Sequence, residues 1–167
     1  MTKTAQMKKS LACLTLTLFA GSASVANAGW QNYMPSSGAP YVGGTSSFDW
    51  SNWSFADGVL TNNATTSRTW TLPMMLDDDF IGNNEGVYGV MKVPSAGQGT
   101  TTAQIAANNL NGVRVWSGTV ISPTCGGAGT YCDTNIGPFP QTAAGMTVYV
   151  NYVVGKGNSI ARTAVHQ

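Results

Sequence analysis

The sequence predicts an all-β protein, a single antiparallel β-sandwich of about eight short strands. Three observations point to this class. Apolar residues recur at every second position in several short runs, which is the period of a strand with one buried face. Turn-forming dipeptides separate these runs, among them Asp57-Gly58 and Asn111-Gly112. Gly, Ser, Thr and Asn are abundant while only 9% of the residues are charged, which favours turns and strand faces over helices.

Residues 1–28 have the pattern of a secretory signal peptide. Lys8 and Lys9 precede an apolar run over residues 11–20, and Ala26-Asn27-Ala28 follows as a small-x-small cleavage site. We therefore expect an exported protein, periplasmic or extracellular, whose residues 29–167 form one domain. The apolar run is too short to cross a bilayer as a mature helix, so we expect no membrane insertion of the mature chain.

The charge of the mature chain argues against one class of partner. Three of the eight Lys and Arg residues lie in the signal and none of the seven Asp and Glu residues does, so residues 29–167 carry a net charge of −2. Nucleic acids and anionic membrane surfaces attract proteins through basic patches. The sequence therefore indicates neither as a partner.

The N-terminal half is expected to hold short strands between turn-rich segments. They cover residues 30–34, 48–55, 59–61 and 66–72. The last two are expected to pair around Asn62-Asn63. Pro73 is expected to end the ladder because it has no amide hydrogen to donate.

The middle of the chain continues with strands over residues 87–93, 101–107 and 113–121. Asn111-Gly112 is the hairpin signal between the last two. Strict alternation puts Val113 and Val115 on one face of the later strand and Arg114 and Trp116 on the other. Residues 122–144 are long for a structureless connection, so we expect an ordered excursion there.

The C-terminal residues carry the clearest strand pattern. Val148, Val150, Tyr152 and Val154 occupy every second position and predict a buried face. Residues 159–165 also alternate, and the four residues 155–158 favour a turn, so we expect a C-terminal hairpin. Tyr149 and Val153, which alternate with the apolar residues of the first strand, are apolar as well. A strand that is apolar on both faces is typical of the centre of a sheet.

Two cysteines remain after the signal, Cys125 and Cys132. In an exported chain they are expected to form a disulfide rather than a redox pair or a metal site. A loop of this length contributes about 2.5 kcal/mol in the chain-entropy model.

Catalytic groups are scarce. His166 is the single histidine and lies next to the C-terminus, so a Ser-His-Asp or Cys-His arrangement has no base within the body of the domain. Paired carboxylates, as in glycoside hydrolysis, are the surviving enzymatic option, with Glu85 as the best candidate. We expect a protein that is not an enzyme and has no cofactor.

An acidic loop is the candidate calcium site. Asp77, Asp79, Asn83 and Glu85 place oxygen ligands within nine residues, and calcium takes six to eight oxygens. The alternative is a solvated loop, because Asp and Asn are common turn formers.

An aromatic segment is the candidate ligand site. Trp50 and Trp53 could stack on sugar rings while Asp49 and Asn52 bond hydroxyl groups. Such rings are more often core in a small β domain, and in a strand that is extended throughout one of the two indoles points away from the core. Trp70 and Trp116 are the better core candidates.

Two motifs carry a resemblance. Trp70-Thr71-Leu72-Pro73 and the closing run from Gly145 to Val150 resemble small uncharacterised exported β-domain proteins of Gram-negative bacteria, with an early W-x-L-P strand and closing G-x-x-x-V strands. The resemblance covers residues 66–160 and implies a short exported β domain. These proteins have no assigned activity to carry over.

The sequence thus predicts a non-catalytic exported protein that binds carbohydrate or a cell surface. A self-associating envelope or matrix subunit, with another envelope protein as partner, is the alternative. A glycoside hydrolase-like enzyme ranks third.

Overall fold

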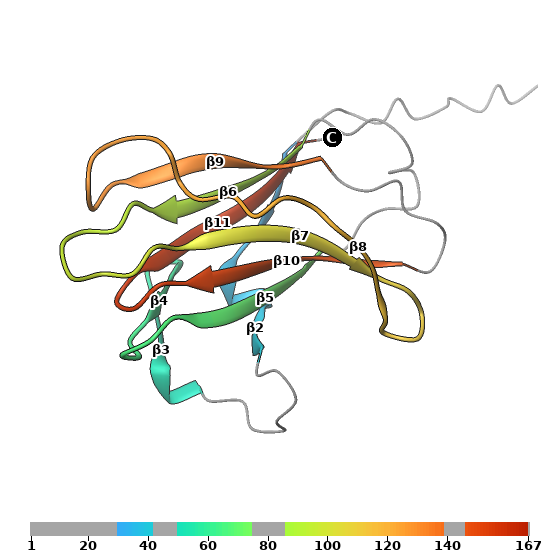
Figure 1. The fold of residues 1–167 in the computed structure, drawn as a ribbon, viewed down its shortest axis with the longest axis horizontal. Coiled ribbons are helices and arrows are strands. Elements are labelled where there is room, and N and C mark those ends of the chain that lie inside the picture. The colour runs from blue at the N-terminus through green and yellow to red at the C-terminus, as the bar shows by residue number, and fades with distance from the viewer. Residues whose placement is uncertain (1–29, 42–49, 75–85, 139–145, 167) are drawn as a thin grey trace, which may run out of the picture.

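The computed structural model describes residues 30–41, 50–74, 86–138 and 146–166. Two antiparallel sheets pack face to face, which confirms the all-β sandwich (Figure 1). The described residues form eleven strands, where about eight were expected. The additional ones include β2 (Ala39–Tyr41) and β9 (Tyr131–Gly137), which lie in segments expected to be turn-rich or an excursion.

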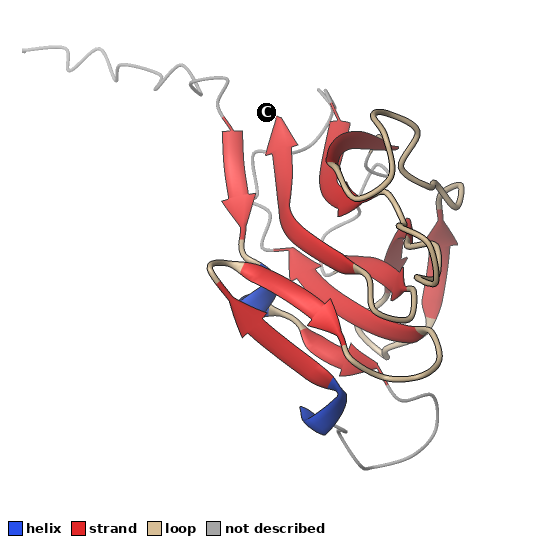
Figure 2. Cartoon of the chain, turned by 90° about the vertical axis from the view of Figure 1, so that its left-hand side faces the viewer, coloured by secondary structure: helices blue, strands red, loops and turns tan. Residues whose placement is uncertain are grey.

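The six-stranded sheet has the order β3-β4-β11-β6-β9, and β1 also pairs with β11. Its bounds are β1 Trp30–Tyr33, β3 Trp53–Ala56, β4 Val59–Asn62, β6 Gly86–Lys92 and β11 Ser159–His166. The five-stranded sheet has the order β2-β5-β10-β7-β8. Its bounds are β5 Arg68–Met74, β7 Thr102–Asn108, β8 Arg114–Ser117 and β10 Thr147–Val154. Two short 3-10 turns, Pro35–Ser37 and Trp50–Asn52, complete the described elements (Figure 2).

The core lies between the sheets and follows the period of two. The alternating face of β10 is buried, as predicted, and so is Trp70 on the neighbouring strand β5. From the other sheet come the buried side chains of Leu60, Val87, Met91, Ile160 and Val165. Each large aliphatic side chain buried in this way contributes about 1.5–3 kcal/mol. Strand β10 lies at the centre of its sheet, as its apolar residues on both faces predicted.

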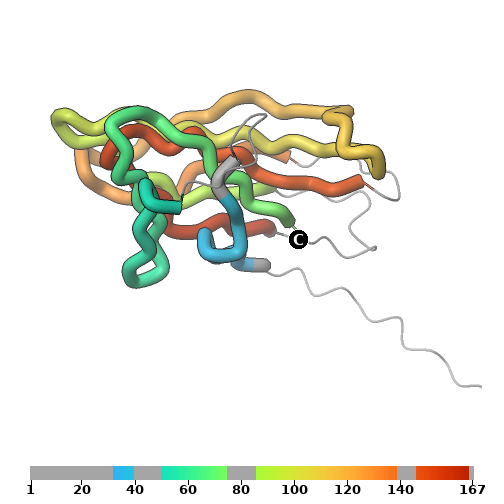
Figure 3. The backbone as a smooth tube through the Cα atoms, turned by 90° about the horizontal axis from the view of Figure 1, so that it is seen from below, coloured from blue at the N-terminus to red at the C-terminus, as the bar shows by residue number. Residues whose placement is uncertain are grey.

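The predicted C-terminal hairpin is wrong. Strand β10 pairs with β5 and β7, whereas β11 pairs with β6, β4 and β1 in the opposite sheet. The turn at residues 155–158 therefore carries the chain from one sheet to the other, and Figure 3 lets the reader follow it. Buried side chains hold this corner: Asn158 donates to the carbonyl oxygens of Lys92 and Gly99, at 3.1 and 2.9 Å.

The predicted pairing of residues 59–61 with 66–72 is wrong for the same reason. Strand β4 pairs with β3 and β11, and β5 pairs with β2 and β10. The Asn62 side chain stabilises the turn through which the chain passes from β4 in one sheet to β5 in the other. Its side-chain nitrogen donates to the carbonyl oxygens of Thr66 and Val154, at 2.9 and 2.8 Å. The two corners between the sheets are thus joined to each other.

Pro73 does not end its strand, because β5 continues to Met74 and Pro73 lies opposite Tyr149. On the other side of β5, strand β2 pairs only with residues 69–71. Pro73 therefore lies beyond the end of β2, where no carbonyl oxygen of that strand would need an amide hydrogen from it.

Both predicted tight turns are present. Asp57 and Gly58 have φ angles of 51° and 77°, and they join β3 to β4. Asn111-Gly112 lies in the connection between the paired strands β7 and β8. The predicted disulfide joins Cys125 to Cys132, with Cα atoms 5.6 Å apart. The predicted signal peptide lies outside the described residues.

Candidate functional site

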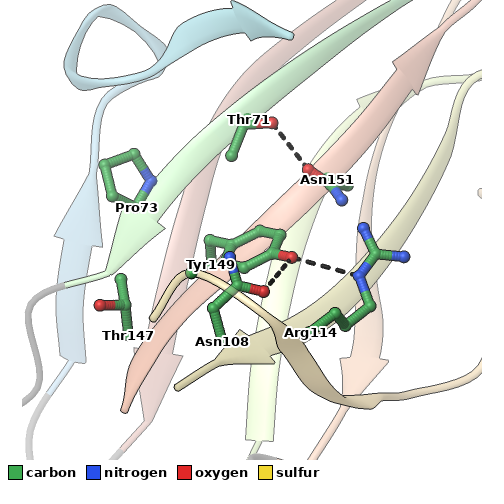
Figure 4. Close-up of a pocket in the computed structure, with 8 residues that line it drawn as sticks. Thr71, Pro73, Asn108, Arg114, Thr147, Tyr149 and Asn151 are labelled. Atoms are coloured by element: carbon green, nitrogen blue, oxygen red, sulfur yellow. Dashed lines mark hydrogen bonds between the residues drawn. The ribbon is translucent and has the colours of Figure 1, made fainter. Parts of the chain in front are cut away.

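A pocket of about 700 Å³ opens on the outer face of the five-stranded sheet. Strands β5, β7, β8 and β10 and the β7–β8 turn supply its lining (Figure 4). The lining residues are Thr71, Pro73, Asn108, Gly112, Arg114, Thr147, Tyr149 and Asn151. None of them was a candidate from the sequence.

The alternation of β5 and β10 places these side chains. Because Leu72, Val148 and Val150 point into the core, their neighbours along each strand point outward. The outer face therefore presents Tyr149 and Asn151, which the sequence shows only as the mixed face of a strand. The same strands thus supply both the core and the floor of the pocket.

A β-bulge brings Arg114 onto this face. Arg114 lies opposite Asn108 and Trp116 lies opposite Ala107, so Val115 has no partner across the pair. The two neighbours of Val115 consequently fall on opposite faces of the sheet: Trp116 packs against the core and Arg114 lines the pocket. The prediction that Arg114 and Trp116 share a face is wrong, because it assumed strict alternation. Bulges at sheet edges often redirect a side chain in this way.

The turn before β8 is held by its own side chain. The Asn109 side-chain oxygen accepts hydrogen bonds from the backbone amides of Asn111 and Val113, both at 3.0 Å. Gly112 has a φ of +74°, which a residue with a side chain rarely adopts. The turn that forms the rim of the pocket next to Arg114 is therefore fixed by its own hydrogen bonds and by Gly112.

Tyr149 connects the two sides of the pocket. The Nε of Arg114 donates to the Tyr149 hydroxyl at 3.2 Å, and that hydroxyl donates to the side-chain oxygen of Asn108 at 2.9 Å (Figure 4). The tyrosine ring is only 9% exposed, so its hydroxyl is held by packing. The three side chains form one series of hydrogen bonds across strands β8, β10 and β7.

A second polar pair lies beside the first. The Thr71 hydroxyl donates to the side-chain oxygen of Asn151 at 2.7 Å, across the pairing of β5 and β10 (Figure 4). The hydrogen bond from Thr71 thereby fixes the orientation of the Asn151 side-chain amide.

Arg114 carries the one formal charge among the lining residues. Within the part of the chain that the structure describes, the one ion pair joins Arg162 to Asp133, at 3.5 Å, in the six-stranded sheet. No lining residue has a carboxylate or an imidazole. The pocket thus offers hydroxyl, amide and guanidinium groups for binding.

The predicted aromatic site has a different geometry from the expected one. Trp50 is 51% exposed but Trp53 is only 8% exposed and belongs to the core. Together with Phe55 they surround Trp70 in edge-to-face contacts, with ring centroids 5.0–5.5 Å apart and interplanar angles of 61–79°. A pair of exposed, coplanar indoles is therefore not formed, and Trp53 lies in the core.

The reason is local. The 3-10 turn at Trp50–Asn52 breaks the extended segment, so the two tryptophans do not follow strand alternation. The backbone carbonyl of Asn52 accepts a hydrogen bond from the amide of Asn63 at 2.7 Å. Asp49 lies outside the described residues.

The acidic loop with Asp77, Asp79, Asn83 and Glu85 also lies outside the described residues. Among residues that are described, no three His, Cys, Asp or Glu side chains come together as a metal site would require. The same residues include no helix long and apolar enough to cross a membrane.

No protein-family model matches this sequence, and no curated protein matches it either. The assignment of a function therefore depends on the geometry of the pocket.

Proposed function

We propose that the protein is a non-catalytic carbohydrate-binding protein of the periplasm or the extracellular space, and that it binds through the outer face of the five-stranded sheet. The observation that carries the proposal is the pocket in which Asn108, Arg114, Tyr149 and Asn151 converge, ordered by their own hydrogen bonds. Binding sites combine an enclosing surface with a few fixed polar groups.

The chemistry of these groups suits a sugar. A saccharide presents hydroxyl groups that both donate and accept, and side-chain amides, hydroxyls and guanidinium groups match them. Pro73 adds an exposed apolar ring between Thr71 and the end of the strand. Because the polar side chains are held before a ligand arrives, less conformational entropy is lost on binding.

The same lining favours binding over hydrolysis. Glycoside hydrolysis generally uses two carboxyl groups that flank the scissile bond. The lining residues supply none, so we do not assign this pocket to a hydrolase. The disulfide between Cys125 and Cys132 supports an oxidising compartment outside the cytoplasm.

Replacing Tyr149 with Phe tests the proposal. The change removes the hydroxyl that orders Arg114 and Asn108 and keeps the buried ring, so the affinity for a glycan identified on an array should fall about tenfold. Isothermal titration calorimetry measures the loss.

Tyr131→Phe is the matched control. It also removes a bonded hydroxyl, from a contact with the Ser159 hydroxyl at 3.0 Å, but in the six-stranded sheet. Its affinity should equal that of the wild type. Equal losses in both variants, or no glycan bound by the wild type, would contradict the proposal.

A second candidate function is favoured by the edge at β8. Leu110, Val113, Val115 and Val120 are all exposed at or next to this edge strand. An edge strand with unpaired backbone groups and aliphatic side chains is suited to pairing with another chain. We propose a second copy of this protein as that partner, in a self-associating envelope subunit.

A further inference from the structure

The hydrogen bonds inside the pocket decide which polar atoms remain for a ligand. Arg114 Nε can only donate, so the Tyr149 oxygen accepts from it and the single tyrosine hydrogen points to Asn108. The side-chain oxygen of Asn108 thus accepts from the tyrosine, and its side-chain nitrogen keeps its hydrogens for a ligand.

Asn151 is in the same situation. Its side-chain oxygen accepts from Thr71, and its side-chain nitrogen keeps both hydrogens for a ligand. In each of the two amides the oxygen thus already accepts one internal hydrogen bond, so donors outnumber the remaining acceptor positions. Arg114 is exposed and contributes the two terminal nitrogens of its guanidinium, because its Nε is already engaged.

The pocket is therefore rich in donors and positively charged. Two oxygens of a planar carboxylate match the paired terminal nitrogens of a guanidinium, and such charge-assisted bonds are about twice as strong as neutral ones. The bulge at Val115 presents this arginine on the outer face beside the two amides, instead of on the face that Trp116 packs against the core.

We infer that the pocket selects acidic saccharides, with Arg114 binding the carboxylate of a uronic acid residue and the amide nitrogens of Asn108 and Asn151 donating to its oxygens. This inference rests on the proposed function and adds the class of ligand.

The test compares one oligosaccharide in two forms: trigalacturonic acid and the same trisaccharide with its carboxylates methyl-esterified. Calorimetry at low salt should show that the wild type binds the acid at least about tenfold more tightly than the ester. Arg114→Gln should bind both forms with the affinity that the wild type has for the ester.

Arg68→Gln is the matched control, because Arg68 is an exposed arginine of the same sheet that does not line the pocket. It should keep the preference for the acid. Asn151→Asp gives an independent test, since a carboxylate still accepts from Thr71 but replaces the donor with an acceptor. It should weaken binding of the acid more than binding of the ester.

The outcomes separate the two proposals. Equal binding of acid and ester by the wild type, or a preference retained in Arg114→Gln, overturns the inference and leaves carbohydrate binding in place. Binding of acetate, a carboxylate without a sugar ring, as tight as that of the trisaccharide overturns the saccharide assignment. If neither these ligands nor any glycan on an array binds, the proposed function falls as well.

Discussion

Tyr152 links the two sheets through a single side chain. It belongs to β10, and its hydroxyl lies 2.5 Å from the hydroxyl of Thr163 in β11, with both residues buried. Burial raises the pKa of the Tyr152 phenol well above its ordinary value, because the charged form would lose its hydration. The hydrogen bond with Thr163 opposes this shift, and the negative charge of Asp133 adds to it.

This shift predicts a loss of stability in alkali. In the unfolded chain Tyr152 ionises near pH 10, whereas in the folded protein it stays protonated, so the free energy of unfolding is fully retained below pH 10 and falls above it. The slope contributed by one such group approaches about 1.4 kcal/mol per pH unit. Denaturant titrations between pH 8 and 11 should show a shallower decline for Tyr152→Phe than for the wild type. An equal decline of stability with pH in the two proteins would contradict this prediction.

At the scale of elements, the corners between the sheets are where sequence reasoning failed. The segment 155–158 has the composition of a hairpin turn, and nothing in its spacing distinguishes a hairpin from a corner. What distinguishes them is long-range: the backbone amide of Asn62 donates to the carbonyl oxygen of Asn158, and the Asn62 side chain reaches Val154. These partners are about 90 residues apart along the chain.

Asn62 should therefore matter far more than its neighbour. Asn62→Ala leaves the carbonyls of Thr66 and Val154 without their donor and removes the acceptor of the Ala64 amide, at 2.9 Å. We expect a loss of about 2–4 kcal/mol in the free energy of unfolding, measured by denaturant titration. Asn63→Ala is the control, because Asn63 is exposed, and it should change stability by less than about 0.5 kcal/mol. Similar losses in both variants would show that the corner does not depend on this amide.

The pocket was missed for an equally physical reason. The core positions of β10 follow from alternation alone, because every second residue is apolar. Arg114 and Trp116 also stand two apart, yet the bulge at Val115 separates their faces. A bulge depends on the register with β7, which no local pattern in residues 113–117 reveals. The mixed outer face of β10 was the only available signal of a site.

At the scale of the whole molecule, the edge at β8 predicts concentration-dependent association. If a second copy pairs there, sedimentation velocity should show the average mass rising with concentration. Val115→Lys places a charge on that edge and should keep the protein monomeric. Val153→Lys, an exposed valine on the outer face of the central strand β10, should associate as the wild type does. A wild type that stays monomeric at every concentration would remove this candidate function.

The passage of the chain from β10 to β11 also determines when the molecule can fold. Strand β10 is the middle strand of one sheet, and β11 is an inner strand of the other, pairing with β1, β4 and β6. A growing chain that has not yet reached residue 147 holds the pairs β3–β4, β6–β9, β2–β5 and β7–β8 and lacks the two strands that join them. Closing these distant pairings is slow, because loop entropy is lost before contacts form. The nascent protein should thus stay open until β10 and β11 have been made, with both sheets then assembling in one event.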